Sequence, residues 1–252
     1  MELDIIYNED CFETFKGIED KSIDMILCDL PYGITACKWD TVIPLEPLWK
    51  EYKRIIKDRG VIVLTASQPF TSRLVMSNLE MFRYSLVWDK VNKYTGALNS
   101  NRMPLRRHED IIVFYRHLPQ FNKQFRKGKP YKGTANSGHG RHTQYGRKKE
   151  IRVIGSNGNH NPCSIIAIEG DVKLECGLHP TQKPVALFEY LIKTYTNEGD
   201  LVLDNCIGSG TTAIACLNTK RNYIGCELNK DYYNICIKRM EEHQSKLMSK
   251  LL

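Results

Sequence analysis

The 252-residue sequence predicts an α/β fold, namely one doubly wound domain with a mostly parallel sheet and a basic insertion. Three observations lead to this prediction. Short apolar runs of strand length alternate with amphipathic stretches in the first part of the chain, which is the order of βαβ units. A central segment lacks this periodicity and holds the excess positive charge. The α/β rhythm then returns, so the two outer parts are predicted to form one doubly wound, Rossmann-type domain.

The first part, residues 1–116, alternates apolar and amphipathic stretches. Runs rich in β-branched and aromatic residues predict strands, and longer stretches with helical spacing predict the helices between them. The predicted strands are Ile23 to Asp29, Gly60 to Thr65, Tyr84 to Trp88 and Asp110 to Tyr115, and the predicted helices are Pro47 to Lys57 and Phe70 to Leu79.

The second part, residues 117–178, is predicted to be an insertion. Between Arg116 and Lys149 the chain holds ten Lys or Arg and no Asp or Glu, which leaves 26 basic and 29 acidic residues elsewhere. The net charge of +7 therefore becomes −3 without this segment. A phosphate-binding surface explains such a distribution, although a mobile, solvated loop is the alternative for any single residue.

The third part, residues 179–252, returns to the α/β pattern. A proline suits the first turn of the helix that begins the part. The predicted elements are a helix at Pro184 to Thr194, a strand at Asp200 to Asp204, a helix at Thr211 to Asn218, a strand at Asn222 to Glu227 and a helix from Lys230 to about Lys246.

Composition argues against a secreted or membrane protein. The longest apolar runs have the length of strands, and no basic-then-apolar leader opens the sequence, so a cytoplasmic location is expected. The nine cysteines form no Cys-x-x-Cys pair and are interpreted as reduced thiols. No metal is predicted, because the residues that could form a zinc site have irregular spacing. These residues are His139, His142, His160, Cys163 and Cys176.

A glycine-rich turn follows the predicted strand that ends at Asp204. Gly208 and Gly210 let the backbone approach a ligand closely, and Glu227 ends the next strand, where a carboxylate can accept bonds from ribose hydroxyls. The pattern predicts a nucleoside-containing cofactor, and a plain strand-to-helix turn is the alternative. With Ala213 the turn also fits a dinucleotide fingerprint, so NAD stays open, although little chain follows for a second nucleotide-binding half.

The tetrapeptide Asp29-Leu30-Pro31-Tyr32 lies at the end of a predicted strand, where open α/β sheets bind ligands. Asp29 and a main-chain carbonyl near Pro31 could accept both N–H groups of an exocyclic base amine. Such acceptors favour the pyramidal nitrogen that attacks a sulfonium methyl group. Tyr32 offers a ring on which a flipped base can stack. A tight turn with a solvated aspartate is an equally good interpretation of the tetrapeptide alone.

Together these motifs resemble the β class of S-adenosylmethionine-dependent DNA amino-methyltransferases of restriction–modification systems. Asp29 to Tyr32 corresponds to the family's Asp/Ser/Asn-Pro-Pro-Tyr motif, His179 to Pro184 to the segment before the cofactor turn, and Asp204 to Thr212 to the cofactor loop. The order of these motifs, with a basic recognition segment between them, defines the β class. The resemblance implies a class I methyltransferase-like fold in which residues 1–116 form the catalytic part and residues 179–252 the cofactor-binding part of one domain. It also implies S-adenosylmethionine as cofactor, duplex DNA as substrate, and often a homodimer and a cognate restriction endonuclease.

The resemblance also implies roles for individual residues. Asp10 would approach the adenine side of the cofactor, Lys183 its methionine end and Glu227 its ribose, while Asp29 would lie near the methyl group. From the residues alone, a helix cap is the alternative for Asp10 and a solvated residue at a helix start is the alternative for Lys183. The full set expected at the cofactor is Asp10, Cys11, Asp29, Lys183, Asp204, Cys206, Gly208, Ser209, Gly210, Thr211, Thr212 and Glu227.

Two residues depart from the family pattern. Leu30 replaces the first proline of the catalytic motif, which is expected to reduce the stiffness of the loop. Cys206 replaces the usual phenylalanine of the cofactor loop, which is expected to weaken packing around the pocket.

Aspartate at the first motif position favours N6 of adenine within this family, whereas serine more often accompanies N4 of cytosine. We therefore expect an adenine-specific enzyme that acts by base flipping. An N4-cytosine enzyme, an RNA or protein-glutamine methyltransferase and a non-catalytic DNA-binding module are the alternatives. Expected contacts to DNA are Asn136, Arg141, Arg147 and Lys148.

Overall fold

The computed structural model describes residues 2–33, 40–131, 156–170 and 182–249. The chain divides into two compact units. The larger unit comprises Met1–Asn122 and Ser164–Leu252, and the smaller unit comprises Lys123–Cys163.

An eight-stranded sheet forms the centre of the larger unit, in the order β1-β10-β9-β2-β3-β5-β4-β8. Neighbouring strands are parallel except where β5 pairs with β3 and β4, so the predicted mostly parallel sheet is confirmed. The strands are β1 (Ile5–Tyr7), β2 (Ile23–Cys28), β3 (Ile56–Ala66), β4 (Phe82–Asp89), β5 (His108–Phe114), β8 (Ile165–Ala167), β9 (Leu201–Asp204) and β10 (Asn222–Cys226).

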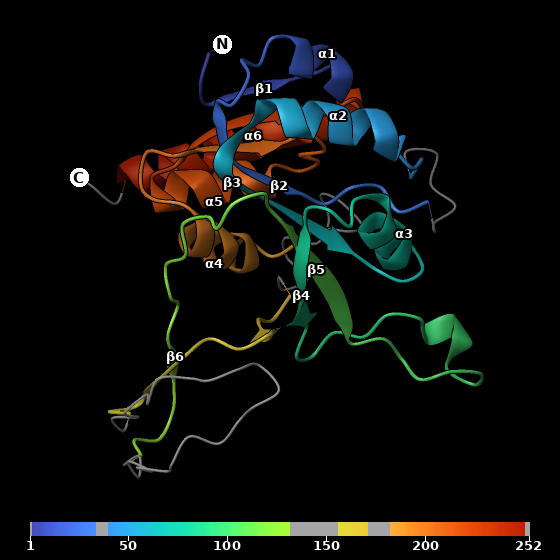
Figure 1. Ribbon diagram of the computed structural model, residues 1–252, viewed down its shortest axis with the longest axis vertical. Coiled ribbons are helices and arrows are strands. Elements are labelled where there is room, and N and C mark those ends of the chain that lie inside the picture. The colour runs from blue at the N-terminus through green and yellow to red at the C-terminus, as the bar shows by residue number, and fades with distance from the viewer. Residues whose placement is uncertain (1, 34–39, 132–155, 171–181, 250–252) are drawn as a thin grey trace. The chain divides into compact units, whose positions relative to one another are not determined.

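Helices cover both faces of this sheet, as a doubly wound fold requires. Alternate side chains of β2 point to opposite faces, so Ile26 and Cys28 join one core while Met25 and Leu27 join the other. The first core packs under α1 (Cys11–Lys16), α2 (Leu45–Ile55) and α3 (Phe70–Ser77), and the second under α4 (Val185–Tyr195), α5 (Thr211–Thr219) and α6 (Lys230–Ser249). In Figure 1, α2 and α4 lie on opposite sides of β2 and β3.

Four elements in the described part of the larger unit were not expected from the sequence, which are β1, α1, β8 and the short 3-10 helix η1 (Ala97–Asn99). Strand β1 and helix α1 are three and six residues long, too short to show a clear period. Strand β8 falls within residues 117–178, yet it extends the sheet by pairing with β4. The only large apolar side chain that β8 buries is Ile166, so its sequence carries little strand signal.

The smaller unit contains a short antiparallel pair in its described part. Strand β6 (Arg126–Lys127) pairs with β7 (Asn159–His160), and the basic side chains on β6 are exposed. The expected DNA contacts Asn136, Arg141, Arg147 and Lys148 lie outside the described residues. The boundaries 117 and 178 stay predictions. Across the described ranges, no helix is long and apolar enough to cross a membrane.

Candidate active site

A cleft of about 1300 Å³ opens at the carboxyl ends of the parallel strands. Its centre lies where β2 and β9 are neighbours. From β2 the chain continues to β3 on one side, and from β9 it continues to β10 on the other. This reversal of direction is the place where open α/β sheets bind ligands. The volume exceeds the roughly 300–1,000 Å³ of a pocket for one small molecule, so the cleft has room for two ligand groups.

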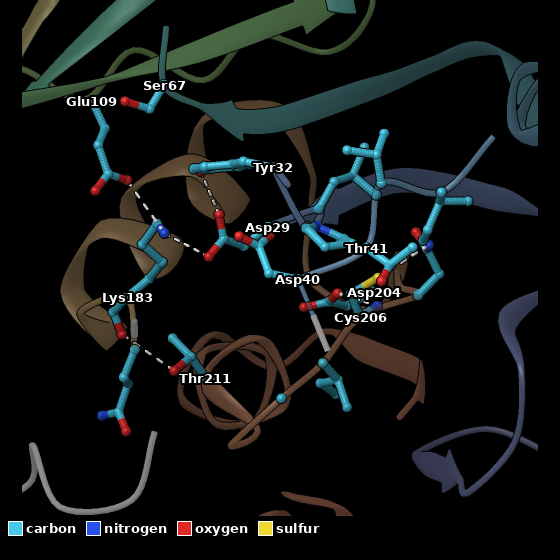
Figure 2. A pocket seen from close by; sticks show the side chains of 18 of the residues that line it. Asp29, Tyr32, Asp40, Thr41, Ser67, Glu109, Lys183, Asp204, Cys206 and Thr211 are labelled. Atoms are coloured by element: carbon cyan, nitrogen blue, oxygen red, sulfur yellow. Dashed lines mark hydrogen bonds and ion pairs between the residues drawn. The ribbon is translucent and has the colours of Figure 1, made fainter. Parts of the chain in front are cut away.

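Asp29 follows β2 directly and lies at the centre of the cleft, as Figure 2 shows. The Tyr32 hydroxyl donates to its Oδ1 at 2.6 Å, and the Thr65 hydroxyl donates to the same oxygen. Lys183 Nζ donates to Oδ2 at 2.5 Å. Asp29 is therefore a fixed carboxylate rather than the solvated residue of a plain turn. Because each carboxylate oxygen has two lone pairs, Oδ2 keeps one acceptor position beside its bond to Lys183.

A chain of alternating charges continues behind Asp29 (Figure 2). Lys183 lies 3.3 Å from Glu109 Oε2, and Lys90 lies 2.6 Å from Glu109 Oε1. The Lys183 side chain is 6% exposed, so it is not a solvated residue at a helix start. Two ammonium groups thus face two carboxylates, and the group of four is electrically neutral.

The chain of charges shifts the pKa values of Lys183 and Glu109 toward their ionised forms. Burial lowers the pKa of Lys183, but Asp29 and Glu109 outweigh burial and raise that pKa above its usual value. Burial raises the pKa of Glu109, but Lys183 and Lys90 outweigh it and bring the pKa below its usual value. Burial, together with Asp29 and Glu109, raises the pKa of the Tyr32 hydroxyl, which stays neutral. Asp29 therefore faces one fixed cation at physiological pH.

The other residues of the tetrapeptide are anchored by packing. Leu30 is 3% exposed and belongs to the first core, so its side chain restrains the loop where the family pattern has a proline. The Tyr32 ring stacks on Phe70, with a centroid distance of 5.3 Å and an interplanar angle of 23°. Lys183 Nζ lies 5.7 Å from the same ring. A target base that stacks on Tyr32 would therefore meet a ring that already packs against Phe70 and lies near Lys183.

The glycine-rich turn and Glu227 meet as the sequence predicts. The Gly208 amide donates to Glu227 Oε2 at 3.0 Å, and the Asn229 amide donates to Oε1 at 2.8 Å. Gly210 has a φ of +84°, and a Cβ there would lie 2.6 Å from Cys236 Sγ, so only glycine fits. Burial raises the pKa of Glu227. The carboxylate is thus held at the end of β10 with spare lone pairs toward the cleft.

Several side chains expected at the cofactor organise the turn itself. The Thr212 hydroxyl donates to buried Asp204, and the Cys206 amide donates to Asp204 Oδ1 at 3.1 Å. Thr211 donates to the Lys183 carbonyl at 3.2 Å, which joins the turn to the residue that holds Asp29. The Ser209 hydroxyl donates to Gln182 at 3.1 Å. These bonds shape the wall of the cleft.

Asp10 combines a local role with a place in the cleft. Its side chain accepts from the Phe12 amide at 2.8 Å and therefore caps helix α1. Asp10 and Cys11 also line the cleft, and burial raises the pKa of Cys11 to about 12, so its thiol stays neutral. Cys206 is partly buried against the first core, where it fills part of the space of the phenylalanine in the family pattern.

Most of the predicted site residues share this cleft. All four tetrapeptide residues and every expected cofactor residue except Gly210 line it. The lining also contains polar residues that the sequence did not assign to the site, which are Glu9, Asp40, Thr41, Ser67, Thr95, Asn99, Arg106, His108, Glu109, Gln182, Asn205, Asn229 and Tyr232. Of these, Glu109 adjoins a predicted strand, but its place in the cleft depends on the antiparallel direction of β5, which the sequence does not indicate.

The raised pKa of buried Asp204 predicts that the stability of the protein depends on pH. Burial is the main cause that raises its pKa from 3.8 to about 6. Between these values the folded state binds the proton that the unfolded state has released, so stability falls as pH rises through this window. At about 1.4 kcal/mol per pKa unit, the loss reaches up to about 3 kcal/mol. Urea unfolding of wild type and Asp204→Asn at pH 4 and pH 7 checks this. An identical pH response of the two proteins contradicts it.

Comparison with known proteins agrees with this geometry. The model of the N6/N4 methyltransferase family, described as DNA methylase, matches residues 23–238. The type II methyltransferase M.HpaI of Haemophilus parainfluenzae is 27% identical over 245 residues, which cover 91% of this chain and 71% of that protein. The DNA adenine methyltransferase YhdJ of Escherichia coli K12 is 26% identical over 263 residues, covering 94% of this chain and 82% of YhdJ.

Solved structures give the same result. The complex of M1.HpyAVI with S-adenosylmethionine has a TM-score of 0.61 at 26% identity. The match covers 93% of this chain and 98% of the M1.HpyAVI chain. The PvuII DNA methyltransferase, described as cytosine-N4-specific, has a TM-score of 0.64 at 16% identity. The match covers 92% of this chain and 84% of the PvuII chain. The latter likeness concerns the fold alone. The predicted family, fold and cofactor are confirmed: the chain belongs to the N6/N4 DNA methylase family, whose members use S-adenosylmethionine.

Proposed function

We propose that the enzyme transfers the methyl group of S-adenosylmethionine to N6 of adenine in duplex DNA, with the target base flipped into the cleft. The observation that carries this proposal is the fixed Asp29 carboxylate, with its remaining acceptor position on Oδ2. An exocyclic amine needs such an acceptor, because its lone pair is delocalised into the ring until the nitrogen becomes pyramidal.

Adenine is favoured over cytosine by two arguments. Aspartate at the first position of the catalytic motif favours adenine in the resembling family. YhdJ, which is described as a DNA adenine methyltransferase, aligns over nearly the whole chain. PvuII, which is described as cytosine-specific, shares the fold at much lower identity. N4-cytosine methylation is the second candidate, because both amines present similar hydrogens.

The residues of the cleft fit S-adenosylmethionine by the chemistry of their donors and acceptors. Glu227 supplies acceptors for the ribose hydroxyls, and the backbone at Gly208 approaches the cofactor without a side chain. Asp29 places a negative charge where the sulfonium would lie. Asp10 lies at the mouth of the same cleft, where it is expected to face the adenine ring. The bound cofactor supplies an electrophilic methyl group.

The chain's own groups would then act on the target amine. Asp29 Oδ2 accepts one N–H, and a main-chain carbonyl near Pro31 accepts the other. Methyl transfer would place positive charge on the amine nitrogen, and the Asp29 carboxylate would stabilise that charge. The amine proton that must be lost would pass to Asp29 Oδ2 and from there to solvent. Lys183 orients Asp29 through its hydrogen bond to Oδ2.

Methyl transfer from labelled S-adenosylmethionine to mixed DNA, followed by digestion to nucleosides, tests the proposal. N6-methyladenine is expected, and Asp29→Ala should abolish the signal. If N4-methylcytosine is the only modified nucleoside, the target is cytosine and not adenine. Label transferred to RNA or to protein in parallel reactions, with none in DNA, would refute DNA as the substrate. A homodimer and a cognate restriction endonuclease remain predictions of the family resemblance, and a cytoplasmic location remains a prediction of the composition.

Glu227→Gln is expected to weaken cofactor binding by about 10- to 100-fold, the range for one lost charge-assisted hydrogen bond. The amide also places a donor against the Gly208 or Asn229 N–H, both of which now donate to the carboxylate. Titration calorimetry with S-adenosylmethionine measures the effect. Glu198→Gln, which alters an exposed carboxylate paired with Lys220, is the control. An unchanged affinity in Glu227→Gln would assign the ribose to other residues.

A further inference from the structure

The connection between β4 and β5, residues 90–107, is a well-defined element beside the active site. We call it the β4–β5 arm. Asp89 and His108 pair at its base, Thr95 and Arg106 form a further bridge, and the short helix η1 (Ala97–Asn99) lies beyond that bridge. Figure 1 shows the arm as the green segment that extends away from β4 and β5.

The arm exposes large apolar side chains to solvent. Leu98 is 103% exposed, Met103 57% and Tyr94 55%. Single exposed apolar residues are ordinary, but several on one short element suggest an interaction site. Leu98 belongs to the one-turn helix at the outer end of the arm, where no described residue shields it. Such a side chain suits insertion into a partner.

The charge of the arm identifies the kind of partner. Residues 90–107 contain five Lys or Arg and no Asp or Glu. Two of the five have acidic partners at the base, because Arg107 pairs with Asp89 at 2.5 Å and Lys90 pairs with Glu109 at 2.6 Å. Arg102 is exposed beside η1. A basic element with an apolar end complements a polyanion with apolar layers inside, which describes duplex DNA.

The arm also forms one wall of the catalytic cleft. Thr95, Gly96, Asn99 and Met103 line the cleft that contains Asp29. Arg106 donates to the Ser67 hydroxyl just after β3, which ties the arm to the cleft wall. A duplex that delivers a base to Asp29 would therefore pass close to this arm.

We propose that the β4–β5 arm contacts DNA beside the target base, with Leu98 entering the base stack and Arg102 binding a phosphate. The inference rests on the proposed DNA-modifying function. Removing a base from the stack leaves a gap, and proteins that distort DNA commonly insert apolar side chains between base steps. Leu98 would hold the distorted duplex open while the base occupies the cleft.

The test uses the full-length enzyme and a duplex containing the sequence that the wild type methylates. Leu98→Ala should lower kcat/KM by about tenfold on the fully paired duplex, equivalent to one lost contact in the transition state. On a duplex with an abasic site opposite the target base, where no base pair must open, the loss should shrink to about twofold. Arg102→Gln should reduce the slope of log affinity against log salt by about 1.

Two variants serve as matched controls. Leu3→Ala removes an exposed leucine beside β1, at the opposite edge of the sheet, and Lys50→Gln removes an exposed charge on α2. Both should behave as wild type. The arm proposal is overturned if Leu98→Ala matches wild type on both duplexes, or if the arm variants lose binding to anionic vesicles rather than to DNA. Absence of DNA methylation by the wild type would refute the proposed function instead, and duplex binding would then test the arm alone.

Discussion

Asp29→Asn is expected to lower kcat for methyl transfer by about 10²- to 10³-fold, the usual effect of removing one fixed group that stabilises transition-state charge. The amide keeps the size of the side chain but removes the negative charge beside the target amine. Because Lys183 retains Glu109 as a partner at 3.3 Å, the surrounding structure should persist. Single-turnover kinetics with labelled cofactor measure the change, and calorimetry should show cofactor affinity altered by less than about tenfold.

The control for this variant is Asp58→Asn. It removes a carboxylate from an exposed ion pair with Lys21, at 3.0 Å and outside the cleft. Its kcat should equal that of wild type. If Asp29→Asn keeps wild-type kcat while remaining folded, the amine is activated by other groups and the proposed mechanism fails.

Lys183→Met is expected to destabilise the protein by about 3–5 kcal/mol, the range for breaking a buried ion pair. The substitution leaves Asp29 and Glu109 as partly buried carboxylates that have lost their shared cation, which is itself buried. Activity should fall as well, because the carboxylate that binds the amine loses its orientation. Urea unfolding measures the stability, and methyl transfer at saturating substrates measures the activity.

Adding Glu109→Gln to the Lys183→Met variant separates the effect of charge balance from the effect of packing. The double variant lacks one cation and one anion, so the remaining pair, Asp29 and Lys90, is again neutral. We expect its destabilisation to be smaller than the sum of the two single effects by about 0.5–3 kcal/mol. Additive losses would show that Lys183 and Glu109 do not act as a charge pair. Lys193→Met, which breaks a partly exposed pair with Glu189, should change stability by less than about 1 kcal/mol.

Much of the fold could be predicted because long apolar runs specify central strands. The β2 run from Ile23 to Cys28 is buried on both faces of the sheet, and β3 shares this pattern. The position of Asp29 followed from the same logic, since it comes directly after such a run. Gly208 and Glu227, which line the cleft, could be selected from the sequence because a close ligand approach needs glycine and an acidic residue at a strand end can accept hydrogen bonds.

The site features that could not be predicted depend on strand direction and on partners that are distant in the chain. Glu109 reaches the cleft only because β5 runs antiparallel, so its beginning lies at the edge where the other strands end. An apolar strand has the same composition in either direction. Lys183 was assigned to the cofactor's methionine end, but its burial between Asp29 and Glu109 requires three segments to meet. Their meeting follows from the tertiary structure and not from any local pattern.

The central pairing of β2 with β9 has a consequence for how the chain folds. The Leu201 amide donates to Asp24 across 177 residues of sequence, so the middle of the sheet joins distant segments. During synthesis β2 can pair with β3 early, but its other edge stays uncovered until residues 201–204 emerge from the ribosome. Such non-local closure is slow and exposes an apolar strand edge meanwhile. This enzyme should therefore depend on chaperones, or on slow translation, more than a protein with local strand order does.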